Sequence, residues 1–472
     1  MNNTSSTSAH EYRMQGWQSS CNRRGTFDIL SSCLILIFAS TWTVLHLNIP
    51  APKDSWWTKG TRKAKWMAVN VLFPEFIFAH AMEERSMAAD ALQLLRLANG
   101  EIYSDLTWWQ KICDTLGFFK GVQDSLRVII QRRNSTDPVF KPRAQSRDWT
   151  MTHALFANMG GFHISKAIID PSYMFGSHPT GDQETFVLDA FQVISLYVRN
   201  VIETVPKISR REIEDRGKAD PLVKALVLMQ FSWLALSVIA RKIDGLPIAQ
   251  LEIATLGFTC CAALTYSAAW QKPKDVDTAI EIRIPEGKYV LPNFYAEYTT
   301  SFFATFFTFD HPIQDQNWHL NRYMSLYAWT ARIANDNFAG DRPRDRPMTG
   351  WLIVGNLVFG GLHCLAWDFD FPTEFEKLLW RISTPTAMLA PLLLLLVVHS
   401  FSLPNWARFA YYDQRKIRFV LHFCAVYILK PLICLIYVGS RLCVIILALA
   451  SLRRMPEDVY KTTWTRYIPS IN

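Results

Sequence analysis

The apolar residues of this chain form long runs, not the short alternating patterns of half-buried strands. Residues 382–407 contain no Asp, Glu, Lys or Arg, and their centre, residues 392–398, is wholly apolar. A helix that crosses a bilayer needs about 20 mainly apolar residues, because its backbone polar groups must pair internally once water is excluded. This window therefore predicts a membrane-spanning helix in a mainly α protein.

Further apolar windows predict a polytopic transmembrane helical protein. Three more have no charged residue: 29–52, 253–271 and 347–367. Residues 225–240 are short for a span, so we expect Lys224 and Arg241 beside them to snorkel to the interface. Residues 419–452 are interrupted by Lys430 and Arg441, which leaves one kinked helix, or a span followed by a surface helix, as alternatives. We expect about six spans, within a range of five to eight, and large cytosolic helical segments.

The charges beside the first span predict its orientation. Residues 1–26 are polar and lack the short apolar core of a signal peptide, so the first span is expected to stay in place as a signal anchor. Five basic residues follow it, at Lys53, Lys59, Arg62, Lys63 and Lys65. By the positive-inside tendency the N-terminus then faces the lumen or the exterior. The side of the C-terminus stays open.

These spans divide the chain into seven segments. They are a luminal or extracellular tail (1–26), the first span (27–52), a mostly cytosolic helical region (53–224), two spans (225–271), a loop region (272–346), a C-terminal transmembrane region (347–452) and a tail (453–472). Residues 66–82 are too short and too close to charges for a simple crossing, which favours an interfacial or re-entrant helix. The alternation from Ile280 to Ile284 predicts a short strand that ends at Pro285.

Composition changes this picture little. The net charge of +8 comes from basic residues that flank spans, so it indicates anionic lipid as the partner and not nucleic acid. Asn2 and Asn3 begin glycosylation sequons that this topology places in the lumen, which predicts a glycoprotein. The nine Cys lack metal-ligand spacing and are typical of packing residues.

The first candidate catalytic residues lie in the segment after Pro74. Glu75 follows that proline in an apolar stretch, and partial burial would suit a general acid. A carboxylate is also favoured in the first turn of a helix, so a helix-capping role is the alternative. His80 is four residues from Glu84 and would share a helical face with it.

Other candidates lie inside or beside the later spans. His46, His363, His399 and His422 lie in apolar segments, where they could bind a metal or relay protons, or simply hydrogen-bond a neighbouring helix. Asp368 and Asp370 follow one span, where they could hold a cation or be a solvated helix end. The full set of candidate catalytic residues is Glu75, His80, His363, Asp368 and Asp370.

Two basic residues within the last apolar block complete the candidates. Lys430 and Arg441 could pair with Glu252, bind an acidic ligand or snorkel to the interface. The chain has no Walker, GxSxG, HExxH or GxGxxG motif, so the sequence points to no cofactor, and the cofactor stays unknown.

Four segments carry a resemblance to a known group. They are CNRRGTFDILSSCLILIFASTWTVLHLNIP (21–50), PEFIFAHAMEE (74–84), WTMTHALFANMGGF (149–162) and SLRRMPEDVYKTTWTRYIPSI (451–471). In this order they resemble a large group of fungal multi-pass integral membrane proteins with no assigned activity. The ending of that group usually has His after the final Pro, where this chain has Ser470. The resemblance implies a fungal membrane protein and carries over no catalytic residue.

Two functions fit these observations. The first is a membrane-embedded enzyme or accessory protein of a secondary-metabolite pathway, acting on an apolar small molecule in the endomembrane system or plasma membrane. The second is a scaffold, sensor or receptor whose cytosolic segments bind partner proteins. An enzyme predicts a polar cavity that joins Glu75, His363 or Asp368, whereas a scaffold predicts that these side chains point separately.

Overall fold

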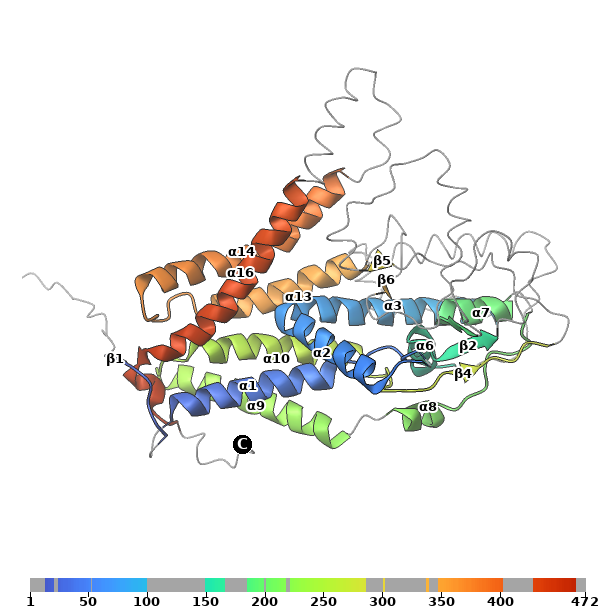
Figure 1. Cartoon of the computed structure of the whole chain (residues 1–472), viewed down its shortest axis with the longest axis horizontal. Coiled ribbons are helices and arrows are strands. Elements are labelled where there is room, and N and C mark those ends of the chain that lie inside the picture. The colour runs from blue at the N-terminus through green and yellow to red at the C-terminus, as the bar shows by residue number, and fades with distance from the viewer. Residues whose placement is uncertain are drawn as a thin grey trace, which may run out of the picture.

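The fold is built mainly from helices, as the sequence predicts. The computed structural model describes residues 13–20, 24–51, 53–99, 149–165, 185–198, 201–217, 221–285, 300–301, 337–338, 347–401 and 428–463. Helices lie side by side along the long axis of the molecule, and a smaller mixed region lies at one end of them (Figure 1). The predicted sequons, the histidine at position 422 and the tail from residue 464 on lie outside the described residues.

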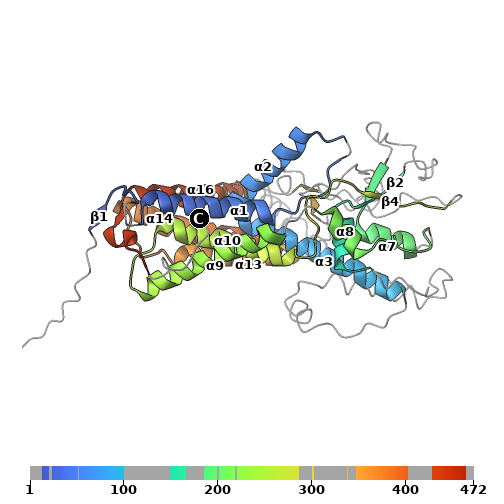
Figure 2. The same ribbon diagram turned by 90° about the horizontal axis from the view of Figure 1, so that it is seen from below.

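Six helices form the bundle. They are α1 (Thr26–Val44), α9 (Pro221–Ile243), α10 (Gln250–Ala268), α13 (Pro347–Cys364), α14 (Glu374–Phe401) and α16 (Lys430–Ala450). Helix α10 packs against α1, α9, α13 and α16, and α14 packs along α16. Successive bundle helices run in opposite directions (Figures 1 and 2), so alternate connections lie at the same end. The described part of the last apolar block, from residue 428 on, contains one α-helix, α16.

Three helices among the described residues are long and apolar enough to cross a membrane. They are Thr26–Val44, Gln250–Ala268 and Lys430–Arg453, and the apolar segment Gly350–Cys364 is shorter. The prediction of about six spans is therefore supported for three helices and stays a prediction for the others.

Helices α2 (Trp56–Leu72) and α3 (Pro74–Ala98) form a bent pair where the sequence predicts one interfacial or re-entrant helix. The bend lies at Phe73, because Pro74 has no N–H to continue α2 and its fixed φ suits the first position of a new helix. Helix α2 points away from the bundle (Figure 2), while α3 packs on α10 and α13.

A second core lies at the distal end of α3. It contains α6 (Met151–Asn158), α7 (Ala190–Val198), α8 (Arg210–Arg216) and a sheet of order β3-β2-β4. Strand β2 (Phe162–Ser165) pairs antiparallel with β3 (Thr185–Leu188) and parallel with β4 (Ile280–Glu281), which confirms the strand expected there. Strands β5 (Thr300–Ser301) and β6 (Asn337–Phe338) form a separate pair.

The described N- and C-terminal segments meet at the other end of the bundle. Strand β1 (Met14–Gln15) pairs antiparallel with β7 (Met455–Pro456), which lies between the short helices η5 (Ser451–Arg453) and η6 (Glu457–Tyr460). The Tyr460 hydroxyl donates to the carbonyl of Gly16 at 3.1 Å. The described N- and C-terminal segments therefore lie on the same side of the bundle.

Arg241 fastens the C-terminal segment to this end. The expectation that it snorkels is wrong, because its side chain is buried and donates to four backbone carbonyls. The acceptors are Pro247 (2.8 and 3.0 Å), Asp458 (3.0 Å), Val459 (2.9 Å) and Lys461 (2.9 Å). A planar guanidinium can bond several carbonyls at once, because its N–H groups point in several fixed directions.

We expect Arg241→Ala to lower the free energy of unfolding by about 2 kcal/mol, because it leaves these carbonyls without their charged donor. The protein in detergent should melt at a lower temperature, and limited proteolysis should cut the segment around Asp458 earlier. The matched control is Lys242→Ala, at the exposed neighbouring residue. Equal melting temperatures for the two variants would contradict the role of Arg241.

Candidate functional site

Glu75 lies at the centre of the bundle and is fully buried. It occupies the first turn of α3, directly after the bend that Pro74 imposes. Helix α13 comes very close at this point: a Cβ added to Gly355 would lie 3.0 Å from the Cβ of Glu75. A larger residue at this position of α13 would have to displace the start of α3.

Glu75 forms an ion pair with Arg441 of α16, with 2.7 Å between Oε1 and Nη2. The Tyr437 hydroxyl, one turn earlier on α16, donates to the same oxygen. Arg441 Nη2 also donates to Asn356 Oδ1 at 3.0 Å, and Asn356 Nδ2 donates to the carbonyl of Met388 on α14. We call Glu75, Asn356, Tyr437 and Arg441 the buried cluster; it joins α3, α13, α14 and α16.

The buried cluster is balanced in charge, with one carboxylate and one guanidinium. Taking both charges out of water is expensive, and their attraction offsets this cost only when both are present and hydrogen-bonded. The guanidinium carbon of Arg441 also lies 4.2 Å from the ring centroid of Phe359, within cation–π range. Charged groups buried in apolar helices are costly and commonly serve function, so this cluster is the first candidate for a site.

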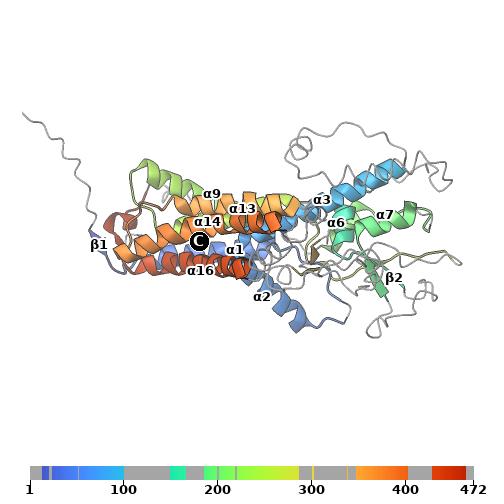
Figure 3. The ribbon, with the colours of Figure 1, turned by 90° about the horizontal axis from the view of Figure 1, so that it is seen from above.

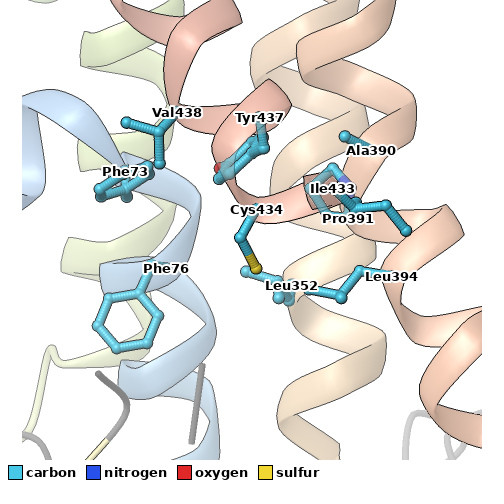
Figure 4. Close-up of a pocket in the computed structure, with 10 residues that line it drawn as sticks. All are labelled: Phe73, Phe76, Leu352, Ala390, Pro391, Leu394, Ile433, Cys434, Tyr437 and Val438. Atoms are coloured by element: carbon cyan, nitrogen blue, oxygen red, sulfur yellow. The ribbon is translucent and has the colours of Figure 1, made fainter. Parts of the chain in front are cut away.

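An apolar pocket borders the buried cluster (Figure 4). It holds about 520 Å³ of empty space when the open solvent at its mouth is included. Its walls come from the α2–α3 bend, α13, α14 and α16: Phe73, Phe76, Leu352, Ala390, Pro391, Leu394, Ile433, Cys434, Tyr437 and Val438. Helices α14 and α16 lean away from α13 and α3 toward the end where α14 finishes (Figure 1), and they lie side by side when seen from above (Figure 3).

Tyr437 belongs to both the pocket and the buried cluster. Its ring stacks on Phe73, with 5.5 Å between the centroids, and its hydroxyl is bonded to Glu75. A molecule in the pocket would therefore meet apolar walls and one phenol, through which it would be coupled to the ion pair.

His80 lies in a different polar group, further along α3. Its Nδ1 is 3.9 Å from Glu84 Oε2, and both oxygens of Glu84 accept from Lys272 Nζ at 2.8 Å. Lys272 also donates to Asn48 Oδ1 at 3.1 Å. These contacts tie α3 to the segments that follow α1 and α10, away from the pocket.

His363 is buried close to the cluster without a hydrogen bond to it among the described contacts. Its Nδ1 hydrogen-bonds the carbonyl of Phe359 at 2.7 Å, one turn earlier on α13. The Phe359 ring lies against both the His363 ring, 4.4 Å between centroids, and the Arg441 guanidinium. A Cβ added to Gly257 of α10 would lie 2.9 Å from the His363 ring, so this imidazole fills a tight contact between helices.

Asp368 and Asp370 lie at the end of the bundle near the chain termini. Asp368 is exposed and pairs with Arg381, with 2.8 Å between Oδ1 and Nη2. The backbone carbonyl of Asp370 accepts from Gln250 Nε2 at 2.6 Å. Of the five candidate catalytic residues, the structure thus places Glu75 beside the pocket, His363 behind Phe359, and the other three elsewhere.

Of the four histidines proposed as a metal or proton site, the two whose side chains are described, His46 and His363, make separate contacts. His46 Nδ1 lies 2.9 Å from the carbonyl of Val44, and its ring is near Tyr266. The side chain of His399 and all of His422 lie outside the described residues. Within the described part of the chain, no group of three or more His, Cys, Asp or Glu residues could hold a metal ion.

Sequence reasoning missed Tyr437 and Asn356 and left the partner of Arg441 open. The suggested pairing of Arg441 with Glu252 is wrong: Glu252 pairs with Arg24, and its Oε2 accepts from the backbone N–H of Ala249 at 3.0 Å. Snorkelling of Arg441 is also wrong, because its side chain is buried. One feature of the sequence could have predicted this partner: Glu75 and Arg441 carry opposite charges, and each is isolated in an apolar stretch.

We expect Glu75→Gln and Arg441→Met each to lower the free energy of unfolding by about 3 kcal/mol, because each leaves one uncompensated buried charge or donor set. The double variant should lose at least about 1 kcal/mol less than the sum of the two. Denaturation in detergent measures all three. The matched control is Glu214→Gln in the exposed Arg210–Glu214 pair, with an expected loss below about 0.5 kcal/mol. Strictly additive losses would contradict the coupling.

Comparisons with known proteins add one finding. No curated protein matches the chain. No solved structure matches it either. A family model described as "Family of unknown function (DUF8562)" matches residues 1–290 and 341–471, which is most of the chain. The protein therefore belongs to the DUF8562 family.

Proposed function

We propose that this protein is a polytopic membrane protein that binds an apolar small molecule in the pocket beside Tyr437. The observation that carries the proposal is the position of that pocket, between four elements and directly against a buried ion pair. The protein would act as a membrane-embedded enzyme or as an accessory protein on this molecule. The setting that we propose for this role is a secondary-metabolite pathway.

Exposed apolar side chains support membrane insertion of the whole bundle. Large apolar residues cover the outer faces of its helices, where water would be an unfavourable neighbour and lipid a favourable one. They include Leu34, Ile35 and Phe38 on α1, Leu236 and Ile239 on α9, Leu389, Leu393 and Leu396 on α14, and Leu435, Ile436, Leu442 and Ile446 on α16. A helix of the length of α1, 19 residues, is about 28 Å long, close to the thickness of the hydrocarbon core.

Exposed tryptophans lie near both ends of the bundle. Trp17 and Trp367 lie near the end that holds the chain termini, and Trp42, Trp57 and Trp270 near the other. Tryptophan is enriched where hydrocarbon meets the headgroups, so two such sets are typical of the two interfaces of a bilayer.

The pairing of β1 with β7 supports an even number of crossings. Both strands must lie on one side of the membrane to bond, so three crossings do not suffice. Six alternating helices satisfy this condition. With a luminal or extracellular N-terminus, the C-terminal segment after α16 then lies on that side too.

The alternative, a scaffold or receptor, has two observations in its favour. Glu75, His363 and Asp368 make separate contacts, as that alternative predicts. The core of α6, α7, α8 and the three-stranded sheet lies at one end of the bundle and would stand outside the bilayer. A partner protein could bind there. The pocket outweighs these observations, because a specific buried polar contact accompanies it.

Six crossings predict where introduced cysteines react. In sealed vesicles, a membrane-impermeant maleimide should label Trp57→Cys and Trp367→Cys from opposite sides, above the background of the unaltered chain. Tags on the N- and C-termini should be accessible from the side of Trp367→Cys. Tags on opposite sides would indicate an odd number of crossings and overturn the topology.

Filling the pocket should block binding. We expect a photoreactive alkyl diazirine to label pocket peptides of the purified protein, and Leu394→Trp to reduce this labelling at least about fivefold, because the larger side chain occupies the space. Leu393→Trp is the matched control, since Leu393 is exposed on the next position of α14. Equal labelling of both variants would place the bound molecule outside the pocket.

A further inference from the structure

The hydrogen-bonding state of the buried cluster restricts what the pocket can hold. The Tyr437 hydroxyl donates its hydrogen bond to Glu75 Oε1. Its oxygen can therefore only accept a hydrogen bond from a ligand. Among the described residues, Glu75 Oε2 accepts no hydrogen bond and Arg441 Nε donates none, although both atoms are buried. The cluster therefore has one further acceptor and one further donor, on side chains that do not themselves line the pocket.

The charge of the cluster restricts the ligand further. Glu75 and Arg441 sum to zero, so the site offers no net attraction that would repay the desolvation of a charged headgroup. The pocket walls are apolar except for Tyr437. A suitable molecule is then mainly hydrocarbon and carries a neutral polar group that donates one hydrogen bond and accepts another.

We propose that the ligand is a lipophilic alcohol, with its hydrocarbon body in the pocket and its hydroxyl bonded to the Tyr437 oxygen at the edge of the buried cluster. A hydroxyl is the simplest neutral group that both donates and accepts. This inference rests on the proposed function, because it names the class of molecule that the same pocket takes.

Competition for labelling of the purified protein tests whether the ligand needs its hydroxyl. The probe is a long-chain primary alcohol with a mid-chain diazirine, and the competitors are the unlabelled alcohol, its methyl ether and the carboxylic acid of the same chain length. The alcohol should compete at about fivefold lower concentration than the ether, which lacks the donated hydrogen bond, and than the acid, which is charged. Equal potency of alcohol and ether would overturn the inference.

Tyr437→Phe gives a second measurement, because it keeps the ring that lines the pocket and removes the oxygen. We expect the alcohol to lose its advantage over the ether in this variant. An advantage that survives in this variant would also overturn the inference. Labelling by the alkyl diazirine, blocked by Leu394→Trp, would leave the proposed function standing in either case; absence of that labelling would overturn the proposed function itself.

Discussion

The ion pair between Glu75 and Arg441 is the interaction on which the centre of this protein depends. It connects a helix from the first quarter of the chain to the last bundle helix, and Asn356 extends it to α13 and α14. Because each charge is tolerable only in the presence of the other, the pair fixes the depth and the rotation of both helices. The α2–α3 bend is held against α16 by a ring contact, because its Phe73 stacks on Tyr437, which is itself bonded to Glu75.

Polar contacts of another kind hold the two ends of the bundle. At the end where β1 pairs with β7, Arg241 donates to the carbonyls of Pro247 and Val459. At the same end, Arg24 pairs with Glu252. At the other end, Lys274 donates to the carbonyls of Trp42 and Thr43, the last turn of α1, at 3.0 and 2.9 Å. Such carbonyls have no partner within their own helix, and a lysine is a favourable donor to them. Polar contacts thus hold both ends of the bundle, and the Glu75–Arg441 pair lies between them.

The pocket derives its chemical character from this arrangement. Apolar walls alone would accept any hydrocarbon. Tyr437 adds a hydroxyl that is hydrogen-bonded to the Glu75–Arg441 ion pair, whose net charge is zero. A bound molecule that bonds to the phenol also changes the surroundings of Glu75 and Arg441, and through them the contact of α3 with α16. The ligand binding that we propose would therefore be coupled to the packing of the bundle centre.

The sequence by itself determined the mainly helical fold, the positions of the apolar helices, the short strand at Ile280 and the isolation of Glu75 and Arg441 among apolar residues. Helical periods and proline breaks are local, so a single segment carries that information. The tertiary structure alone decided that Arg441 meets Glu75 and not Glu252, that Arg241 is buried, and that strands β1 and β7 pair at one end of the bundle. Each of these depends on which helices become neighbours, and residues hundreds of positions apart leave no local signal of their contact.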